Sequence, residues 1–372
     1  MRVLVIGAGI LGASTAYHLA LKGVKVDVVD EEHQGKATLA GAGIVCPWAT
    51  KADEPEWYEM YAAGARFYDE LITGLVARGE TSLGYRKVGA LVVAEDPGEF
   101  EAAEQRVRER TKAAPEAGKV SRLTPAEARA LFPPLRDGLP AIHISGAARV
   151  DARLLAAAML RAAISLGATY RRDNVSLAMR DGGLLTLGSS GQQLHADEIV
   201  VTAGAWASRI LQPLGLHHPV QPQKGQIVHL SLPGVATAQW PVLLPMGSHY
   251  LLAFDDSRVV IGATREDNSG FDYRVTAAGQ HEVLSAGLSI APGLANATHI
   301  ETRIGFRPAA PTIRPILGRV PGLPGLTIGN GLGASGLTVG PFAGKCLADL
   351  VSGQPLDRSL NPYSPQGLTP TA

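Results

Sequence analysis

The stretch "MRVLVIGAGILGASTAYHLALKGVKVDVVD" at residues 1–30 decides how the rest of the chain is interpreted. Aliphatic residues at 3–6 predict a buried strand, three glycines follow, and an apolar run to Leu21 predicts a helix before a second strand at 24–29. The stretch does not fit an export signal or a membrane anchor, because glycines and polar residues interrupt its apolar run. It predicts the first β-α-β unit of a dinucleotide-binding fold.

Each glycine of the spacing Gly7-x-Gly9-x-x-Gly12 has an expected task. Gly7 makes the tight turn, Gly9 lets the backbone approach a pyrophosphate, and Gly12 lets helix and strand pack closely. The pyrophosphate would lie on the free N–H groups of the helix N-terminus. Asp30, eighteen residues after Gly12, is placed to accept hydrogen bonds from an adenosine ribose. The motif alone is weak, and a nucleotide-free packing unit is the alternative, but the ordered strand, glycines, helix, strand and acid favour the dinucleotide.

Composition bounds the class of protein. A chain of 372 residues usually exceeds one hydrophobic core, so two domains are expected. The net charge is zero, so we expect no nucleic-acid partner, which would require a basic excess. Cys46 and Cys346 stand far apart with no metal-ligand spacing. We therefore expect no disulfide framework, no metal site, and a cytoplasmic location.

The remaining chain alternates between two kinds of segment. Helices are predicted at 54–79 and 99–112, and another begins near Asp151 and ends at Gly167. The strand at 199–201 ends in small residues that let a backbone approach a ligand or merely turn tightly. Residues 217–303 are rich in strands and turn signals, which predicts an antiparallel sheet inserted into the α/β domain.

A second glycine loop lies near the end of the chain. The strand at 326–329 is followed by Gly331, Gly333 and Gly336, and then by a helix at 339–351. Two such loops indicate that the chain holds one large cofactor with both. The predicted fold class is α/β, a Rossmann-like domain with the GxGxxG motif and an inserted antiparallel-sheet substrate domain of α+β type. The predicted cofactor domain comprises 1–82, 143–216 and 304–372, and the substrate domain comprises 83–142 and 217–303.

Five motifs together resemble one family. They are the GxGxxG motif with its acid, "VVTAGAW" at 200–206, "GQIV" at 225–228, "RIGFRP" at 303–308 and "GLGASGLTVGPFAG" at 331–344. In this order the chain, from about residue 1 to 353, resembles the FAD-dependent D-amino-acid oxidase superfamily, which includes glycine oxidase, sarcosine oxidase and D-amino-acid dehydrogenases. The resemblance implies FAD between two domains, and it places the residues that would bind it: Gly7, Ala8, Gly9, Ile10, Leu11, Gly12, Asp30, Glu31, Lys36, Ala37, Thr38, Ala42, Gly43, Ile44, Val175, Ala203, Gly204, Trp206, Gly331, Gly333, Ala334, Ser335, Gly336, Leu337 and Thr338.

Three residues are candidates for the substrate site. A planar guanidinium suits a substrate carboxylate, and Arg307 stands where the family has such a clamp, although a structural arginine is the alternative. Tyr250 matches a family tyrosine that contacts the carboxylate or covers the substrate, but it could equally pack within the sheet. Arg265 falls on a pocket-lining position; turned inward it would favour an acidic or polar substrate, and turned outward it would be solvated.

The resemblance implies oxidation of the CH–NH bond of a small amino acid, glycine or a D-amino acid, by hydride transfer to the flavin. The imine is then hydrolysed to a 2-oxo acid and ammonia. Oxygen or a quinone or other electron carrier would be the acceptor, a homo-oligomer is compatible with the family, and peripheral association with the inner face of a membrane stays open. The alternatives are a flavin dehydrogenase of hydroxy acids or glycerol phosphate, a nicotinamide-linked enzyme and a redox-silent binding protein.

The chain also departs from the family. Leu332 and Ala334 replace a Gly-His pair and a second arginine that many relatives carry in the C-terminal loop. Neither Cys46 nor Cys346 matches the cysteine that binds flavin covalently in sarcosine oxidases, so FAD should be non-covalent. Trp48 either narrows the active site or belongs to the core.

Overall fold

The structure, a computed structural model, describes residues 1–247 and 249–368. Its first layer is a six-stranded sheet in the order β18-β19-β12-β1-β2-β9. All neighbours in this sheet pair in parallel except β18 and β19, which are antiparallel. The strands are β1 (Arg2–Ile6), β2 (Lys25–Asp30), β9 (Thr169–Arg172), β12 (Glu198–Val201), β18 (Ile316–Arg319) and β19 (Leu326–Asn330).

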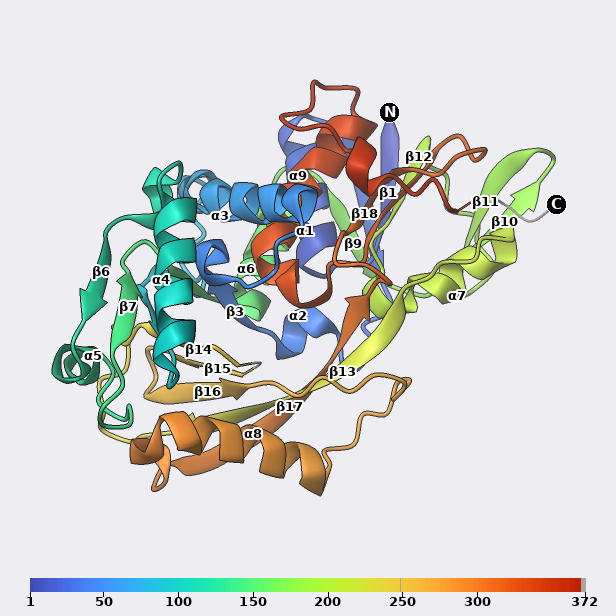
Figure 1. The fold of residues 1–372 in the computed structure, drawn as a ribbon. Helices are drawn as coiled ribbons and strands as arrows, with labels where there is room; N and C mark the ends of the chain where they lie inside the picture. The colour runs from blue at the N-terminus through green and yellow to red at the C-terminus, as the bar shows by residue number, and fades with distance from the viewer. Residues whose placement is uncertain (248, 369–372) are drawn as a thin grey trace.

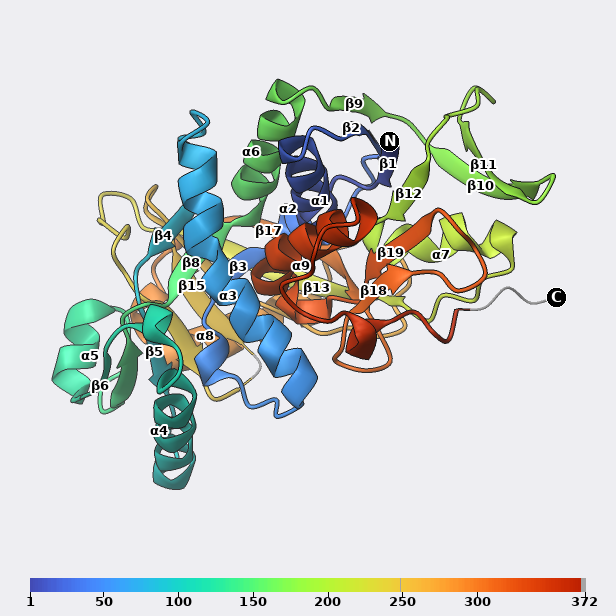
Figure 2. The same ribbon diagram turned by 90° about the horizontal axis from the view of Figure 1, so that it is seen from above.

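Both faces of this sheet are covered, as the continuous aliphatic runs of its strands require. Val3 and Val5 pack into a core shared with four helices, whereas Leu4 and Ile6 face the opposite core. The helices on the first face, which lie together in Figure 2, are α1 (Ile10–Leu21), α3 (Pro55–Val76), α6 (Ala152–Ser165) and α9 (Gly336–Val351). The other face carries α7 (Ala207–Leu211) and the hairpin of β10 (Val175–Arg180) and β11 (Gly183–Gly188).

The second layer is an eight-stranded sheet in the order β17-β13-β16-β15-β14-β5-β7-β6. Its longest strands, β13 and β17, reach from this sheet toward the first one (Figure 1), and Phe306 of β17 donates its N–H to Gly35 after β2 at 2.8 Å. The strands are β5 (Ala90–Val93), β6 (Val120–Leu123), β7 (Ala141–Ile144), β13 (Gln221–Ser231), β14 (Val242–Pro245), β15 (Tyr250–Ala253), β16 (Arg258–Gly262) and β17 (Thr298–Ala309).

The remaining elements connect or cover the two sheets. A three-stranded sheet has the order β3-β8-β4, and α8 packs against β13 and β16. These elements are α2 (Ala37–Ala40), β3 (Ala42–Val45), β4 (Tyr85–Lys87), α4 (Pro97–Thr111), α5 (Pro125–Leu131), β8 (Ala148–Asp151) and α8 (Ala277–Ile290).

The predicted fold class is confirmed, with three differences in detail. The eight-stranded sheet is not wholly antiparallel, because β14 pairs in parallel with β5, a strand that comes from a distant part of the chain. Helix α8 lies within the segment expected to be strands. Helix α9 begins at Gly336, three residues before the predicted start, so the last glycine of the loop already belongs to the helix. The domain boundaries stay a prediction; β7 and β17 extend across positions 143 and 304.

Candidate functional site

A cavity lies between the two sheets, bounded by the loops after β1, β2, β12 and β19 on one side and by β13, β15 and β17 on the other. These loops follow the carboxyl ends of parallel strands, where open α/β sheets bind their ligands. The cavity is lined by the following residues of the predicted site: Gly7, Gly9, Ile10, Leu11, Asp30, Glu31, Lys36, Ala37, Thr38, Val175, Ala203, Gly204, Trp206, Tyr250, Arg307, Gly333, Ala334, Gly336 and Leu337.

The first glycine loop has the geometry expected from its spacing. Gly7 has a φ of 104°, and a Cβ there would lie 2.6 Å from the carbonyl oxygen of Thr202. A Cβ on Gly12 would lie 1.9 Å from the carbonyl oxygen of Gly7, so helix α1 can pack this closely only against a glycine. Gly9 lines the cavity at the N-terminus of α1, where the helix dipole favours an anion. The Ile10 N–H of this turn donates to the Thr38 hydroxyl at 3.0 Å.

The two acids at the end of β2, Asp30 and Glu31, differ in the number of hydrogen bonds that their carboxylates accept from the protein. Buried Asp30 accepts hydrogen bonds from the Ala8 N–H at 2.5 Å, the Glu32 N–H at 2.6 Å and the Lys36 ammonium at 2.8 Å. Burial favours a higher pKa, but the charge on Lys36 and these hydrogen bonds outweigh it and lower the pKa of Asp30. Glu31 is exposed at the cavity, where its Oε2 lies 3.0 Å from His33 Nε2.

The second glycine loop is fastened to the "TAGAW" strand end by residues that the sequence analysis did not single out. Asn330, at the end of β19, donates through Nδ2 to the Gly204 carbonyl at 2.9 Å and lies 2.8 Å from His218 Nε2. Its Oδ1 accepts the Gly331 N–H at 2.8 Å. Burial lowers the pKa of His218 to about 4, so the ring is neutral and its Nε2 can accept. The two loops therefore form one rigid border of the cavity.

The other predicted cofactor residues lie behind the cavity lining. Thr338 donates its hydroxyl to the Ile44 carbonyl at 2.8 Å and so joins α9 to β3. A Cβ on Gly43 would lie 2.3 Å from Val150, which explains a glycine there by packing. Seven of these residues are not part of the lining, and their direct role stays a prediction: Ala8, Gly12, Gly43, Ile44, Gly331, Ser335 and Thr338. The side chain of Ala42 lies outside the described part of the structure, so its role also stays a prediction.

At the substrate end, two strand glycines make room for two functional side chains. The Arg307 guanidinium crosses over Gly225 and donates through Nη1 to the Thr264 carbonyl at 3.0 Å. The ring of Tyr250 lies over Gly262, where a Cβ would come within 2.4 Å of the phenol. Burial lowers the pKa of Arg307 and raises that of Tyr250, so both groups keep their protons at neutral pH.

Arg265 and Trp48 have different outcomes. Arg265 is exposed and does not line the cavity, but its charge acts on both Tyr250 and Arg307, so it lies beside the substrate end. Trp48 is 1% exposed and belongs to the hydrophobic core of the second sheet rather than to the cavity lining. Sequence position alone does not distinguish an inward tryptophan from a core tryptophan.

Neither cysteine lines the cavity, and the described residues include no candidate metal site. Cys46 and Cys346 are buried free thiols outside the lining, and burial raises the pKa of each to about 12, which makes them unreactive. In the part of the chain that the structure describes, no group of His, Cys, Asp and Glu is arranged to hold a metal ion. Within the same residues, no helix is both long and apolar enough to cross a membrane.

The lining suits an elongated dinucleotide with a flat ring system. It joins an acidic end at β2, a glycine-rich middle at the α1 N-terminus, and an apolar end near Leu337 and Ile227. A side chain on Gly7 or Gly12 would collide with neighbouring backbone, so the glycines serve this geometry. His33 and Arg209 also line the cavity, although no motif in the sequence indicates them.

Comparisons with known proteins agree with this arrangement. A family model described as "FAD dependent oxidoreductase" matches residues 2–350. The chain belongs to this family, which confirms the resemblance to the D-amino-acid oxidase superfamily. It is therefore an oxidoreductase with FAD as its cofactor.

Individual relatives are similar over the full length. The crystal structure of iminodiacetate oxidase (IdaA) from Chelativorans sp. BNC1 has a TM-score of 0.98, 67% identity and complete coverage of both chains. The oxidoreductase YurR of Bacillus subtilis is 48% identical over 365 residues, 98% of each chain. Glycine oxidase of Pseudomonas aeruginosa is 32% identical over 380 residues, 98% of this chain and 99% of the relative.

Proposed function

We propose that the enzyme oxidises the carbon–nitrogen bond of a small amino acid whose carboxylate binds Arg307. The observation that carries this proposal is the state of Arg307 itself. It lines the cofactor cavity, it is only partly exposed, and it has no carboxylate partner among residues 1–247 and 249–368. A partly buried charge without a counter-ion favours an anionic ligand at this position.

The finer proposal concerns a second carboxylate. Arg265 adds a second positive charge beside Arg307 and Tyr250. A substrate with carboxylates on both sides of its nitrogen would engage both arginines. Iminodiacetate, after which the similar Chelativorans protein is named, has this constitution. We propose a substrate of this N-carboxymethyl amino acid class, with glycine as the weaker ligand because it lacks the second anion.

The residues of the chain bind and orient, and the cofactor accepts electrons. Arg307 holds the first carboxylate in a bidentate geometry, and the Tyr250 hydroxyl donates to the same anion or to its neighbour. Ile227 and Leu337 supply apolar lining that excludes water from the reacting carbon. When bound, FAD would supply the hydride acceptor for oxidation of the substrate carbon–nitrogen bond to an imine, which water would hydrolyse to a 2-oxo acid and an amine. Since Arg307 and Tyr250 keep their protons, the substrate amine must enter in its neutral form.

A hydroxy-acid or glycerol-phosphate substrate is less well supported. Such a substrate would need several basic residues on the substrate sheet, and three of the four available are already paired elsewhere. Lys224 pairs with Glu266 and Asp272, Arg258 with Asp151 and Asp256, and Arg274 with Asp272. Of these four, only Arg265 forms no ion pair among the described residues.

An anaerobic titration of the purified holoenzyme tests the proposal. Flavin absorption is followed while iminodiacetate, glycine, sarcosine, D-amino acids, L-proline and 2-hydroxy acids are added in turn. Bleaching by iminodiacetate at the lowest concentration is expected, and admission of air then separates oxygen from a quinone or other carrier as acceptor. Bleaching by a hydroxy acid alone would move the function to the alternative.

A further inference from the structure

The segment 263–276 between β16 and α8, here called the strap, runs beside β13 and carries Arg265. Glu266 and Lys224 exchange backbone hydrogen bonds at 2.9 and 3.0 Å, as adjacent antiparallel strands do. The Gln226 N–H donates to Thr264 Oγ1 at 2.9 Å. Strand β13 therefore lies between β17 on one side and the strap on the other.

Side chains alternate between the two faces along β17, β13 and the strap, and this alternation places Arg307 and Lys224 on opposite faces. Arg307 of β17 pairs with Gln223 of β13, and Gly225 lies on the same face two residues further along. Lys224 alternates with them and faces the other side together with Glu266, its partner on the strap. The guanidinium can cross the bare Gly225 to reach the Thr264 carbonyl, so the strap backbone fixes the clamp.

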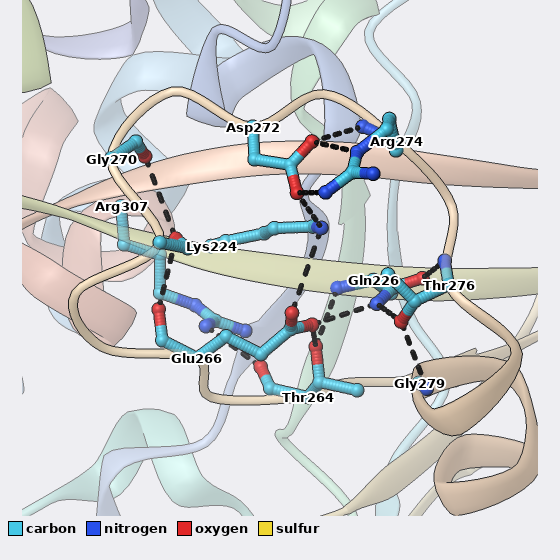
Figure 3. A network of polar contacts seen from close by, with 11 residues as sticks. Lys224, Gln226, Thr264, Glu266, Gly270, Asp272, Arg274, Thr276, Gly279 and Arg307 are labelled. Carbon is cyan, nitrogen blue, oxygen red and sulfur yellow. Dashed lines mark hydrogen bonds and ion pairs between the residues drawn. The ribbon is translucent and has the colours of Figure 1, made fainter.

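On the face of β13 that carries Lys224 and is turned away from Arg307, a polar network connects the strap to β13 (Figure 3). The Lys224 side chain is 1% exposed and lies 3.6 Å from Glu266 Oε2 and 3.8 Å from Asp272 Oδ2. Glu266 Oε1 also accepts from Gln226 Nε2 at 2.8 Å and from the Thr264 hydroxyl at 2.7 Å. Gln226 exchanges two further hydrogen bonds with Thr276 at the start of α8, at 2.8 and 3.0 Å.

Both acids of this network are ionised at neutral pH. Burial would raise the pKa of Glu266, but hydrogen bonds from Thr264 and Gln226 and the charge on Lys224 bring it below its usual value. Hydrogen bonds from Arg274 lower the pKa of Asp272, and the charge on Lys224 adds to this. Lys224 thus bridges two anions that come from different points of the strap, and without it they would repel each other.

We propose that Lys224 is a positioning residue: its two ion pairs hold the strap against β13, and so hold the Thr264 carbonyl and Arg265 next to Arg307. This inference rests on the proposed function, because it concerns how the substrate carboxylates are received. Lys224 itself points away from the cavity and contacts neither substrate nor cofactor. Its side chain acts only through the strap.

The test compares Lys224→Met with the wild-type holoenzyme. Methionine keeps the length and apolar stem of lysine but not its charge, so Glu266 and Asp272 lose their shared cation. We expect faster amide hydrogen exchange in the strap. Malonate, a dicarboxylate, serves as the ligand for the carboxylate site, and its Kd, measured from the flavin absorption, should rise about tenfold or more. KM should rise with it, while kcat changes less than about threefold. Lys51→Met, which breaks the exposed ion pair with Glu99, should change none of these values.

Rescue separates positioning from a general loss of structure. In Lys224→Met/Glu266→Gln the unpaired carboxylate is gone, while the amide oxygen can still accept from Thr264 and Gln226. The malonate Kd should then return to within about threefold of wild type. If Lys224→Met does not fold, Asp272→Asn removes one of the two ion pairs and should give an intermediate rise in strap exchange and Kd.

Two outcomes would overturn the inference. Unchanged strap exchange and malonate Kd in Lys224→Met would show that the ion pairs hold nothing in place. Equal losses of malonate binding, bound FAD and Tm without rescue by Glu266→Gln would show a structural role only. If the wild type oxidises no amine, the proposed function fails, but strap exchange measured without ligand still decides whether Lys224 holds the strap.

Discussion

Replacement of Gly225 by alanine tests the carboxylate clamp with a single methyl group. A Cβ at this position would lie 2.8 Å from Arg307 Nη2 and 2.9 Å from both Cζ and Nη1. These distances are about 0.5 Å shorter than an ordinary contact of 3.4 Å, so the guanidinium must move. Gly225 does not have a positive φ, so β13 itself can accept alanine.

The expected loss is one of function rather than stability. A guanidinium that moves off Gly225 gives up its 3.0 Å hydrogen bond to the Thr264 carbonyl and its alignment with the substrate. A binding group that is misplaced by up to about 1 Å lowers the rate by about tenfold to a hundredfold. This corresponds to an increase of about 1.4–2.8 kcal/mol in the activation free energy. We therefore expect kcat/KM for the substrate found by flavin bleaching to fall by this factor, with Tm lowered by less than about 2 °C.

The control is Gly183→Ala, another strand glycine, where the nearest atom to an added Cβ is 3.7 Å away. Its kcat/KM and Tm should match those of the wild type. If Gly225→Ala also keeps the wild-type kcat/KM, the substrate carboxylate is not bound at Arg307, and the proposed clamp is refuted. A loss of bound FAD and Tm in parallel with kcat/KM would instead place the effect in folding.

Three further predictions concern Arg265 beside the substrate end of the cavity, the two acids at the cofactor end, and the buried residue His18. Arg265→Met should reduce the ratio of kcat/KM for iminodiacetate to kcat/KM for glycine by about tenfold, because one charge-assisted contact is lost. An unchanged ratio would mean that Arg265 is only solvated. Glu31→Gln should raise the Kd for FAD about tenfold, measured by flavin fluorescence, and should not change the Tm of the apoprotein. Asp30→Asn should lower both FAD affinity and Tm, because Asp30 accepts hydrogen bonds that hold the glycine loop in place. Burial lowers the pKa of His18 from 6.5 to about 4, so its contribution to stability is complete above pH 6.5 and decreases as the pH falls toward 4, by about 2 kcal/mol at pH 5. The Tm difference between pH 7 and pH 5 should therefore shrink in His18→Gln, and an equal difference would contradict the assignment.

Local geometry made the cofactor end of the site predictable from sequence. Gly7 and Gly12 are required by contacts within one β-α-β unit, so their spacing alone reports the structure around them. The predicted start of α9 is three residues late because a glycine-rich loop and the first turn of a helix look alike in sequence. Asp30 was expected to face a ribose, but the sequence does not show that Ala8, Glu32 and Lys36 already donate to it.

Long-range pairing made the substrate end harder to predict. The parallel pairing of β14 with β5 joins segments about 150 residues apart, and no local pattern specifies such a partner. The same holds for Lys224, which sequence shows only as one of several basic residues on the substrate sheet. Its burial and its two anionic partners depend on the strap returning beside β13, which becomes visible only in three dimensions.

A signal for the substrate end was nevertheless present, in the residues that lack side chains. A glycine in the middle of a strand weakens it and often marks a place where another group approaches closely. Gly225 in "KGQIV" makes room for Arg307, and Gly262 at the end of "RVVIG" makes room for Tyr250. Both glycines stand on strands that pair with the strand carrying the side chain in question. A strand glycine, whether inside its strand as Gly225 or at its end as Gly262, therefore indicates which neighbouring side chain lies across the sheet. Here the two glycines indicate the two groups proposed to receive the substrate.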